Sequence, residues 1–552
     1  MKLLSLLFAA SLLITCRQSV IETPAVAVTP PTENPVAAPG LIHRAGQTLL
    51  QNDRVIMLNG VAFGNWVWEN NLRQSMAHHN EQDFARLNQM GLNCVRFYLN
   101  YQWFEDDAKP YTYKQAGWDW LDQNIAWAKK HGVYLMLNVH VPQGGYQSQG
   151  KGTALWDVAE NQNRLAGWWR EIARRYRTEA TIAGYDLLNE PVTTRSIDQW
   201  KDLANKLVKS IRAVDTGHLI VVERLNAAAG EWKDVNGERN LFLVADDNVM
   251  YQFHTYDPFE YTHQQFTWAG RTPDENERYP NESKLSMPPD LQWYTAIFTS
   301  PAIPTGTTTW NRYTGTIYRV TDPKIRVGSA VCQASGLQGG QVSFDEVVVK
   351  EYDETGQFVR DVLTLDLNAL TGWFFWSKNG SGKAEIVPGQ TGNAIRIGQT
   401  TDDANVGYST DKFVVRPGYS YQINGSARGE NVPSSATVRF RIDFETTSQP
   451  ILTRNKTYLK NAVQYFADWG KRNNVPMYLG EYGVGAPCFK NDRGGLQWTE
   501  DMIDISRELG FHTTYHAYHE DSFGWYFGGN TLPNPANANT PLIELFKRKF
   551  GK

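Results

Sequence analysis

Residues 184–191 read Gly184-Tyr185-Asp186-Leu187-Leu188-Asn189-Glu190-Pro191. The apolar stretch predicts a strand that delivers an Asn-Glu pair at its carboxyl end, after which Pro191 turns the chain out of the strand. A carboxyl group held there among aromatic neighbours can keep its proton near neutral pH and act as a general acid. Taken alone, a glutamate after a strand is more often a helix cap or half of a salt bridge.

This strand belongs to a repeated pattern, in which a short apolar stretch is followed by a longer stretch of helical periodicity. Several helical stretches end in glycine, as at Gly91 and Gly132. Eight such units predict the α/β fold class and a closed (β/α)8 TIM barrel, whose chemistry sits at the C-terminal ends of the strands. The predicted strands are residues 59–63, 93–99, 133–140, 182–190, 219–223, 249–256, 476–481 and 512–518.

One interval interrupts the pattern between Tyr256 and Lys456, where about two hundred residues replace what should be a loop. Its composition shifts to Thr, Gly, Val and Tyr with period-two runs, for example at 437–444. We therefore predict an inserted all-β sandwich of jelly-roll type. The predicted domains are a barrel in two parts, residues 46–287 and 451–552, and the insert, residues 288–450, with 257–287 left as an active-site loop.

A second glutamate stands, like Glu190, at the end of a short apolar strand. Tyr478-Leu479-Gly480-Glu481-Tyr482-Gly483 combines a short apolar strand, a terminal Glu and a glycine that lets the chain turn away. Without the insert, the two glutamates are three β/α units apart, on strands four and seven. Two carboxyl groups facing each other at about 5 to 5.5 Å across a scissile bond are what a retaining glycosidase needs.

Over residues 49–287 and 454–550 the sequence resembles glycoside hydrolase family 5, a clan A family of retaining (β/α)8-barrel enzymes. In that family an Arg ends strand two, a His strand three, Asn-Glu strand four, His-x-Tyr strand six and the nucleophilic Glu strand seven. The matching positions are Arg96, His140, Asn189 with Glu190, His254 with Tyr256, and Glu481.

The resemblance implies a role for each of these residues. Glu190 would be the acid/base and Glu481 the nucleophile. Arg96 and Tyr256 would keep the nucleophile ionised, by charge and by a hydrogen bond. Asn189 would bind the sugar 2-hydroxyl, and His140 and His254 would orient sugar hydroxyls or the acid/base.

The family usually ends strand eight with a Trp that stacks under the sugar, whereas this chain has Tyr515-His516-Ala517-Tyr518-His519 there. Either Tyr518 or Trp525 is expected to supply the platform. Other aromatic residues in strand-end loops are expected to line the cleft or, equally, to belong to the core: Trp66, Trp68, Trp103, Trp156, Tyr261 and Trp268.

The insert resembles carbohydrate-binding modules of the family four and nine type. The fragments are Phe413 to Tyr421 with its Pro417-Gly418 pair, the strand Phe344 to Val349, and Trp310-Asn311-Arg312-Tyr313. Their order implies a circular permutation, with the usual ends joined near 353–358 and the opening strand at 365–376. A purely structural sandwich remains the alternative.

The N-terminus predicts export. Lys2 precedes an apolar run at 3–14, too short for a membrane span of about 20 residues and suited to a signal peptide, residues 1–15. Cys16 follows in Leu13-Ile14-Thr15-Cys16, which resembles a bacterial lipobox, and a Pro-rich linker completes residues 16–45. We expect lipid anchoring at the cell envelope, at the outer membrane or cell surface, with plain secretion as the alternative.

Composition limits the partners. A net charge of −4 leaves no broad basic field for nucleic acid, and 19 Trp with 26 Tyr in 552 residues is typical of a glycan ligand or of an aromatic core. The remaining cysteines, Cys94, Cys332 and Cys488, have no metal-type spacing. No cofactor and no metal site are expected, and the protein should be a monomer.

The leading hypothesis is an endo-β-1,4-glucanase that acts on a plant polysaccharide. A β-mannanase, a xyloglucanase or another β-glycanase is the alternative within the family, because the motifs indicate a mechanism and not a sugar. An inactive surface glycan-binding lipoprotein and a structural adhesin are the alternatives outside it. The adhesin leaves the ordered set of strand-end residues unexplained.

Overall fold

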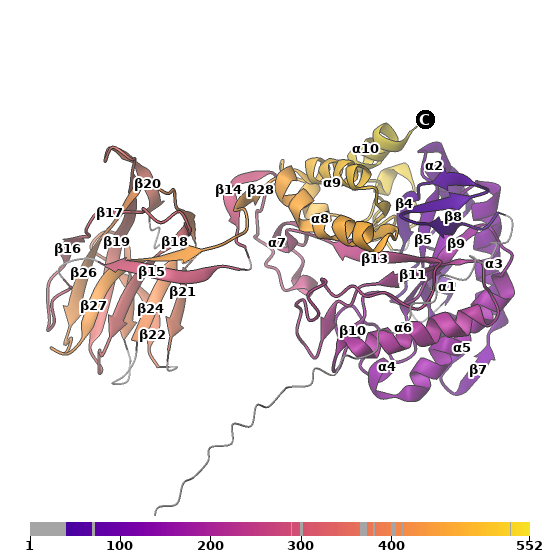
Figure 1. Ribbon diagram of the computed structural model, residues 1–552, viewed down its shortest axis with the longest axis horizontal. Coiled ribbons are helices and arrows are strands. Elements are labelled where there is room, and N and C mark those ends of the chain that lie inside the picture. Colours follow the sequence, from indigo (N-terminus) through magenta and orange to yellow (C-terminus); the bar gives the residue numbers. More distant parts are fainter. Residues whose placement is uncertain are drawn as a thin grey trace, which may run out of the picture.

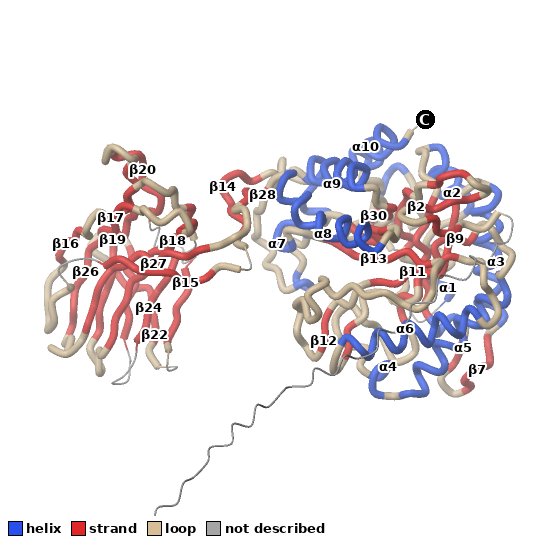
Figure 2. The backbone as a smooth tube through the Cα atoms, viewed as in Figure 1, coloured by secondary structure: helices blue, strands red, loops and turns tan. Residues whose placement is uncertain are grey.

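The computed structural model describes residues 40–68, 72–288, 290–298, 302–364, 373–378, 381–398, 405–410, 412–529 and 531–551. The predicted signal peptide, Cys16 and the linker up to residue 39 lie outside the described residues. Within the described part of the chain, no helix has the length and apolar character needed to span a bilayer. A helix-wrapped barrel and a unit built of strands make up the fold (Figures 1 and 2).

The predicted eight-stranded parallel barrel is confirmed. Its strands close in the order of the chain, with the last strand pairing with the first (Thr513 opposite Asn59). Every residue of the second strand is buried, as expected for a parallel strand covered on both faces. The barrel strands are β4 (Asn59–Phe63), β5 (Cys94–Asn100), β8 (Tyr134–Val141), β9 (Ile182–Asp186), β11 (Leu219–Glu223), β13 (Val249–Thr255), β29 (Met477–Tyr482) and β30 (His512–Tyr515).

A small antiparallel sheet closes the N-terminal end of the barrel. It consists of β1 (His43–Ala45), β2 (Thr48–Gln51) and β3 (Arg54–Ile56), and it begins three residues before the predicted barrel start. Leu49 of this sheet packs with Met136 at the lower end of the barrel strands. Apolar packing therefore fills this end, and the C-terminal ends of the strands face the cavity described below.

The helices cover the outside of the barrel (Figure 2). Polar caps define where several begin: Asn80 and Asp83 form a capping box at α2, and Ser196 caps α6. Trp168 and Trp169 are fully buried in the hydrophobic core, so their helix packs against the barrel. The helices are α1 (Leu72–Ser75), α2 (Glu81–Gln89), α3 (Gln115–Lys130), α4 (Ala154–Asp157), α5 (Ala159–Tyr176), α6 (Ile197–Arg212), α7 (Phe259–Thr262), α8 (Lys456–Asn473), α9 (Gly495–Leu509) and α10 (Thr540–Phe550).

Two short strand pairs decorate the barrel loops. The first joins β6 (Glu105–Asp106) to β7 (Lys109–Tyr113), and the second joins β10 (Val192–Thr193) to β12 (Ala227–Ala228). The second pair begins directly after Pro191. The loop that follows strand four is therefore held in place by the pairing of β10 with β12.

The predicted all-β insert is confirmed as two packed sheets. One has the order β15-β27-β18-β24-β21 with β25 on β18, and the other has β16-β26-β19-β23-β22 with β17 and β20 on its edges. Phe344 and Phe440, from opposite sheets, meet in their common core. The strands are β15 (Gln292–Phe298), β16 (Asn311–Thr314), β17 (Tyr318–Arg319), β18 (Ile325–Ser335), β19 (Gln341–Tyr352), β20 (Phe358–Thr364), β21 (Trp373–Ser377), β22 (Lys383–Pro388), β23 (Asn393–Gly398), β24 (Asn405–Thr410), β25 (Phe413–Val414), β26 (Ser420–Glu430) and β27 (Thr437–Thr446).

The chain leaves the barrel and returns to it along one antiparallel ribbon. β14 (Asn281–Ser286) pairs with β28 (Leu452–Arg454), with Ser286 opposite Leu452, and this ribbon lies between the two units in Figure 1. Arg454 pairs with Glu260 of the barrel loop. Residues 257–287 were predicted as one active-site loop. Their first part lines the cavity, and their last part, β14, forms the connection to the insert.

The predicted joint of the permuted module lies at a hairpin. β19 and β20 pair antiparallel, and the turn between them covers 353–357. Of the proposed opening strand at 365–376, residues 365–372 lie outside the described residues. The permutation stays a prediction.

Candidate active site

A cavity of about 820 Å³ opens at the C-terminal ends of the barrel strands. Glu190, which follows β9, and Glu481, in β29, both line it. Eight Trp, Tyr and Phe side chains also line it: Trp66, Trp68, Tyr146, Trp232, Tyr256, Phe259, Trp268 and Phe523.

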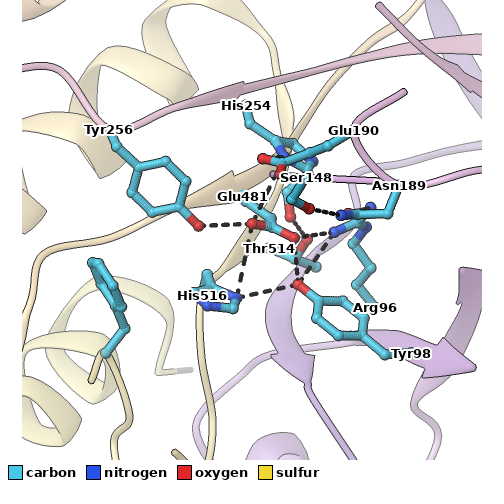
Figure 3. Close-up of polar contacts among 12 residues, drawn as sticks. Arg96, Tyr98, Ser148, Asn189, Glu190, His254, Tyr256, Glu481, Thr514 and His516 are labelled. Carbon is cyan, nitrogen blue, oxygen red and sulfur yellow. Dashed lines mark hydrogen bonds and ion pairs between the residues drawn. The ribbon is translucent and has the colours of Figure 1, made fainter. Parts of the chain in front are cut away.

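Three donors hold the Glu481 carboxylate (Figure 3). Arg96 Nη1 lies 2.6 Å from Oε1, and the Tyr98 hydroxyl donates to the same oxygen at 2.5 Å. The Tyr256 hydroxyl donates to Oε2 at 2.7 Å. The predicted contacts of Arg96 and Tyr256 are therefore present, and Tyr98 adds a third.

Positive charges keep Glu481 ionised. Burial alone would raise the pKa of its carboxyl group, but the charges of His254, His516 and Arg96 outweigh burial and hold that pKa well below its usual range. Nδ1 of His254 lies 3.7 Å and Nδ1 of His516 3.9 Å from Oε2. Glu481 is therefore a carboxylate at neutral pH.

Glu190 is clamped through both its backbone and its side chain. Its φ of 43° lies in the left-handed region, which costs a non-glycine residue roughly 1–3 kcal/mol and persists only where the surroundings hold it. Its N–H donates to Glu223 Oε2 at 2.9 Å, and its Oε1 lies 3.0 Å from His254 Nδ1. One ligand atom each of Glu190, His254 and Glu481 lies within 4.8 Å of the other two, so the two glutamates face each other at short range.

A third carboxyl group, that of Glu223, lies behind this pair. Glu223 ends β11, is fully buried, and accepts a hydrogen bond from Gln252 Nε2 at 3.0 Å. Burial raises the pKa of Glu223 to about 8, against the opposing charge of His254.

Asn189 and His140 occupy the predicted positions beside the glutamates. Asn189 Oδ1 accepts from Arg96 Nη2 at 2.9 Å, and its Nδ2 donates to Ser148 Oγ at 3.0 Å, which fixes the orientation of the amide. The His140 ring stacks on Tyr98 with centroids 3.9 Å apart. Burial holds the pKa of His140 well below its usual value, so the ring is neutral.

The expectation that Tyr518 or Trp525 supplies the strand-eight platform is wrong. Trp525 is fully buried in the hydrophobic core, and Tyr518 is 1% exposed with its hydroxyl donating to Asp83 Oδ1 at 2.7 Å. Neither side chain lines the cavity. The residues after β30 that do so are His516 and the loop residues Glu520, Asp521, Ser522 and Phe523.

The expectation that Trp156 lines the cleft is also wrong. Trp156 is 3% exposed, and its Nε1 donates to Gln147 Oε1 at 2.8 Å inside the core. The same core contains Trp103 and Tyr261. These rings pack the strand-end loops against the core. From the sequence alone, a ring that is buried in this way cannot be distinguished from a ring that contacts a ligand.

Four residues that contact the glutamates or their partners were not found from the sequence. Tyr98 lies two residues after Arg96 on one strand, so the period of two could have placed both on the same side. Glu223 ends a predicted strand, which is a signal of the same kind as at Glu190. His516 lies inside the strand that was predicted to run to residue 518, and Glu520 follows that strand by two residues, so no signal pointed to either.

Among the described residues, Glu190, His254 and Glu481 are the group whose atoms lie close enough to hold a metal ion. Arg96 lies 2.6 Å from Glu481 Oε1, and Tyr256 occupies Oε2. A permanent cation at that distance makes the site unfavourable for a second one.

Residues 53–295 match the family described as Cellulase (glycosyl hydrolase family 5). This range includes Glu190, His254 and Tyr256, and it ends before Glu481. It covers the first six barrel strands and the connection to the insert.

Individual relatives match shorter parts of the chain. Endoglucanase C of Acetivibrio thermocellus is 28% identical over 214 residues, which are 38% of this chain and 60% of that protein. A β-xylosidase of Phanerodontia chrysosporium is 32% identical over 188 residues, which are 32% of this chain and 38% of that protein. The crystal structure of endoglucanase Cel5A from Thermotoga maritima gives a TM-score of 0.47 at 15% identity, covering 89% of this chain and 96% of that one.

The family range lies in the part of the chain that builds the first six barrel strands and carries Glu190. The chain covers about 60% of the length of the endoglucanase that it matches. The first part of this barrel thus matches the cellulase domain of glycosyl hydrolase family 5.

Proposed function

We propose that this chain is a retaining glycoside hydrolase that cleaves a β-linked plant polysaccharide, foremost as an endo-β-1,4-glucanase. The observation that carries the proposal is the short distance, within 4.8 Å, between carboxylate oxygens of Glu190 and Glu481 in an open cavity. Retaining enzymes hold their two carboxyl groups about 5 to 5.5 Å apart, and inverting enzymes about 6.5 to 9.5 Å.

In the first step the ionised Glu481 attacks the anomeric carbon, and Glu190 gives its proton to the departing glycosidic oxygen. The C–O bond to the leaving sugar breaks as the bond to Glu481 forms. In the second step water attacks the same carbon, Glu190 takes the proton of that water, and the bond to Glu481 breaks. Asn189, held between Arg96 and Ser148, is placed to bind the 2-hydroxyl of the reacting sugar.

The walls of the cavity support a sugar polymer as substrate. Trp68, Trp232 and Trp268 are 49%, 60% and 55% exposed at the rim, where flat rings can stack on sugar faces. Among the matching proteins, five are named endoglucanase, one cellodextrinase, one β-xylosidase and one probable glucan 1,3-β-glucosidase. These names favour a β-glycan and leave the backbone sugar open, so a β-mannanase or a xyloglucanase remains the alternative. An inactive glycan-binding protein would have no need for an ionised nucleophile with three donors.

We expect Glu481→Ala to reduce turnover by about 10⁴-fold or more, because no other group can form the covalent intermediate. Azide should restore part of the activity and give a glycosyl azide of α configuration. Glu190→Ala should keep activity on substrates with good leaving groups, and azide should then give the β product. Activity is measured with aryl β-cellobiosides, and the azide products are identified by proton NMR.

The two azide products serve as each other's control, because each reports which carboxyl group was removed. A β product from the Glu481 variant, or an inverted sugar from the wild type, would contradict the assignment of roles.

We further propose that the inserted sandwich binds glycan. Phe375 of β21 packs on the sandwich core, so its neighbours Phe374 and Trp376 point to the outer face of that sheet. Arg441 lies over the Trp376 ring at 5.5 Å from its centroid. Trp293, 61% exposed on the edge strand, reaches the same outer face, where Arg441 Nη2 also bonds Asp443 at 2.7 Å. Exposed rings beside fixed polar groups are typical of a sugar-binding face.

Removal of residues 288–450 with a short Gly/Ser bridge should leave a folded barrel that cleaves soluble oligosaccharides, because β14 and β28 already meet at the base of the insert. Hydrolysis of insoluble polymer should fall, since the local concentration effect is lost. Trp376→Ala should weaken pull-down on that polymer about tenfold, whereas Phe358→Ala, an exposed ring on the other sheet, should not. Equal loss of activity on both substrates would mean that the sandwich supports the cleft instead.

We also propose that the protein is exported and anchored by a lipid on Cys16 to the bacterial cell envelope. The support is sequence alone: the apolar run at 3–14, Cys16 directly after it, and the Pro-rich linker. Cells fed labelled palmitate should label the wild type, and Cys16→Ser should remove the label and release the protein into the soluble fraction. An unlabelled wild type would leave secretion as the correct alternative.

A further inference from the structure

His516 stands at the end of strand eight, where the chain has no tryptophan facing the cavity. Its side chain is buried, lines the cavity and contacts Phe523 at 5.6 Å between ring centroids. Its two nitrogens face different partners. Nδ1 lies 3.1 Å from the Tyr98 hydroxyl, and Nε2 lies 3.5 Å from Glu520 Oε1.

The direction of each hydrogen bond follows from the protons that are present. Tyr98 has one hydroxyl proton and donates it to Glu481 Oε1 at 2.5 Å. Its oxygen is then an acceptor, so Nδ1 of His516 carries a proton and donates it to Tyr98. Nε2 faces a carboxylate, which favours a proton on that nitrogen too. Figure 3 shows His516, Tyr98 and Glu481 in this arrangement.

Glu520 is fixed before it meets the imidazole. Its Oε1 accepts the backbone N–H of Phe523 at 2.9 Å, and its own N–H donates to the Tyr526 carbonyl at 3.1 Å. The carboxylate is therefore anchored by the loop that follows β30 and needs no movement to face His516.

We propose that Glu520 is a positioning residue that keeps His516 doubly protonated, so that the chain Glu520–His516–Tyr98 holds the nucleophile Glu481 ionised and in place. The inference rests on the proposed function for the role of Glu481. In this protein a cation thus stands at the end of strand eight.

The charged surroundings agree with this assignment. Burial by itself would lower the pKa of His516, but the carboxylates of Glu520 and Glu481 raise it to about 9. The titratable and charged groups that face the imidazole are Glu520 on its own loop, Glu481 on β29, Tyr98 and Arg96 on β5, His140 on β8, and Tyr256 and His263 after β13.

The competing explanation is that Glu520 only caps the turn at Phe523. Glu520→Gln separates the two roles, because the amide oxygen can still accept the Phe523 N–H whereas the negative charge is gone. Glu81→Gln is the matched control. Glu81 lies 3.1 Å from His131, and neither residue lines the cavity, so this variant removes the same charge beside a histidine that the site does not use.

The first readout is the titration of His516, followed by NMR of its ring. Because the pKa of His516 is raised, its imidazole is positively charged below that pKa and loses the charge as the pH rises through it. In the wild type the positive charge of the His516 ring should persist to about pH 9, and in Glu520→Gln it should be lost about two pH units lower. An unchanged His516 titration in Glu520→Gln would overturn the proposal, as would an equal shift in Glu81→Gln.

The second readout is the pH dependence of kcat/KM on a dinitrophenyl β-cellobioside, whose leaving group needs no proton from Glu190. At pH 8 Glu520→Gln should lose about tenfold, and at pH 5, where His516 is charged in both proteins, it should stay within twofold of the wild type. A loss of the same size at both pH values would show a merely structural role and contradict the proposal.

Tyr98→Phe tests the path of the effect. If the charge of His516 acts through the Tyr98 hydroxyl, Glu520→Gln should cost less in the Tyr98→Phe background than in the wild type, whereas full additivity would contradict the path. A wild type without glycosidase activity would overturn the proposed function, and the NMR titration would still decide whether Glu520 holds the charge on His516.

Discussion

The buried ion pair between Arg96 and Glu481 is the interaction on which the rest of the site depends. A carboxylate taken out of water costs several kcal/mol unless fixed charges and hydrogen bonds replace its hydration. Arg96 is fully buried and meets this cost with one planar group, which reaches Glu481 at 2.6 Å, Asp186 at 2.8 Å and Asn189 at 2.9 Å. One guanidinium thereby fixes side chains from strands four and seven relative to strand two.

The barrel makes this arrangement possible because it brings strand ends from distant parts of the chain to one rim. Glu190 and Glu481 are separated in sequence by the whole sandwich, yet their strands belong to one closed barrel. The insertion leaves the barrel intact since it begins and ends on a paired ribbon, β14 with β28, which holds the two points of departure side by side.

The sequence predicted all eight barrel strands and the insert, because buried parallel strands and period-two runs leave strong local patterns. The strand patterns placed both glutamates at one rim, and the resemblance to glycoside hydrolase family 5 added Arg96, His254 and Tyr256. The predictions for Trp156 and Trp525 were wrong, because both rings lie in strand-end loops. Whether a ring in such a loop is buried depends on neighbours far away in the sequence. The short strand β30 ends at Tyr515, earlier than predicted, and this brings His516 rather than Tyr518 to the cavity.

The central claim is that Glu481 forms a covalent bond to the sugar. It is tested most directly by incubating the wild type with a 2-deoxy-2-fluoro β-cellobioside that carries an activated leaving group, since the fluorine slows the second step and traps the intermediate. Digestion and mass spectrometry should find the added sugar on the peptide that contains Glu481. A sugar attached to any other residue, or none attached while the substrate is turned over with inversion, would contradict the account.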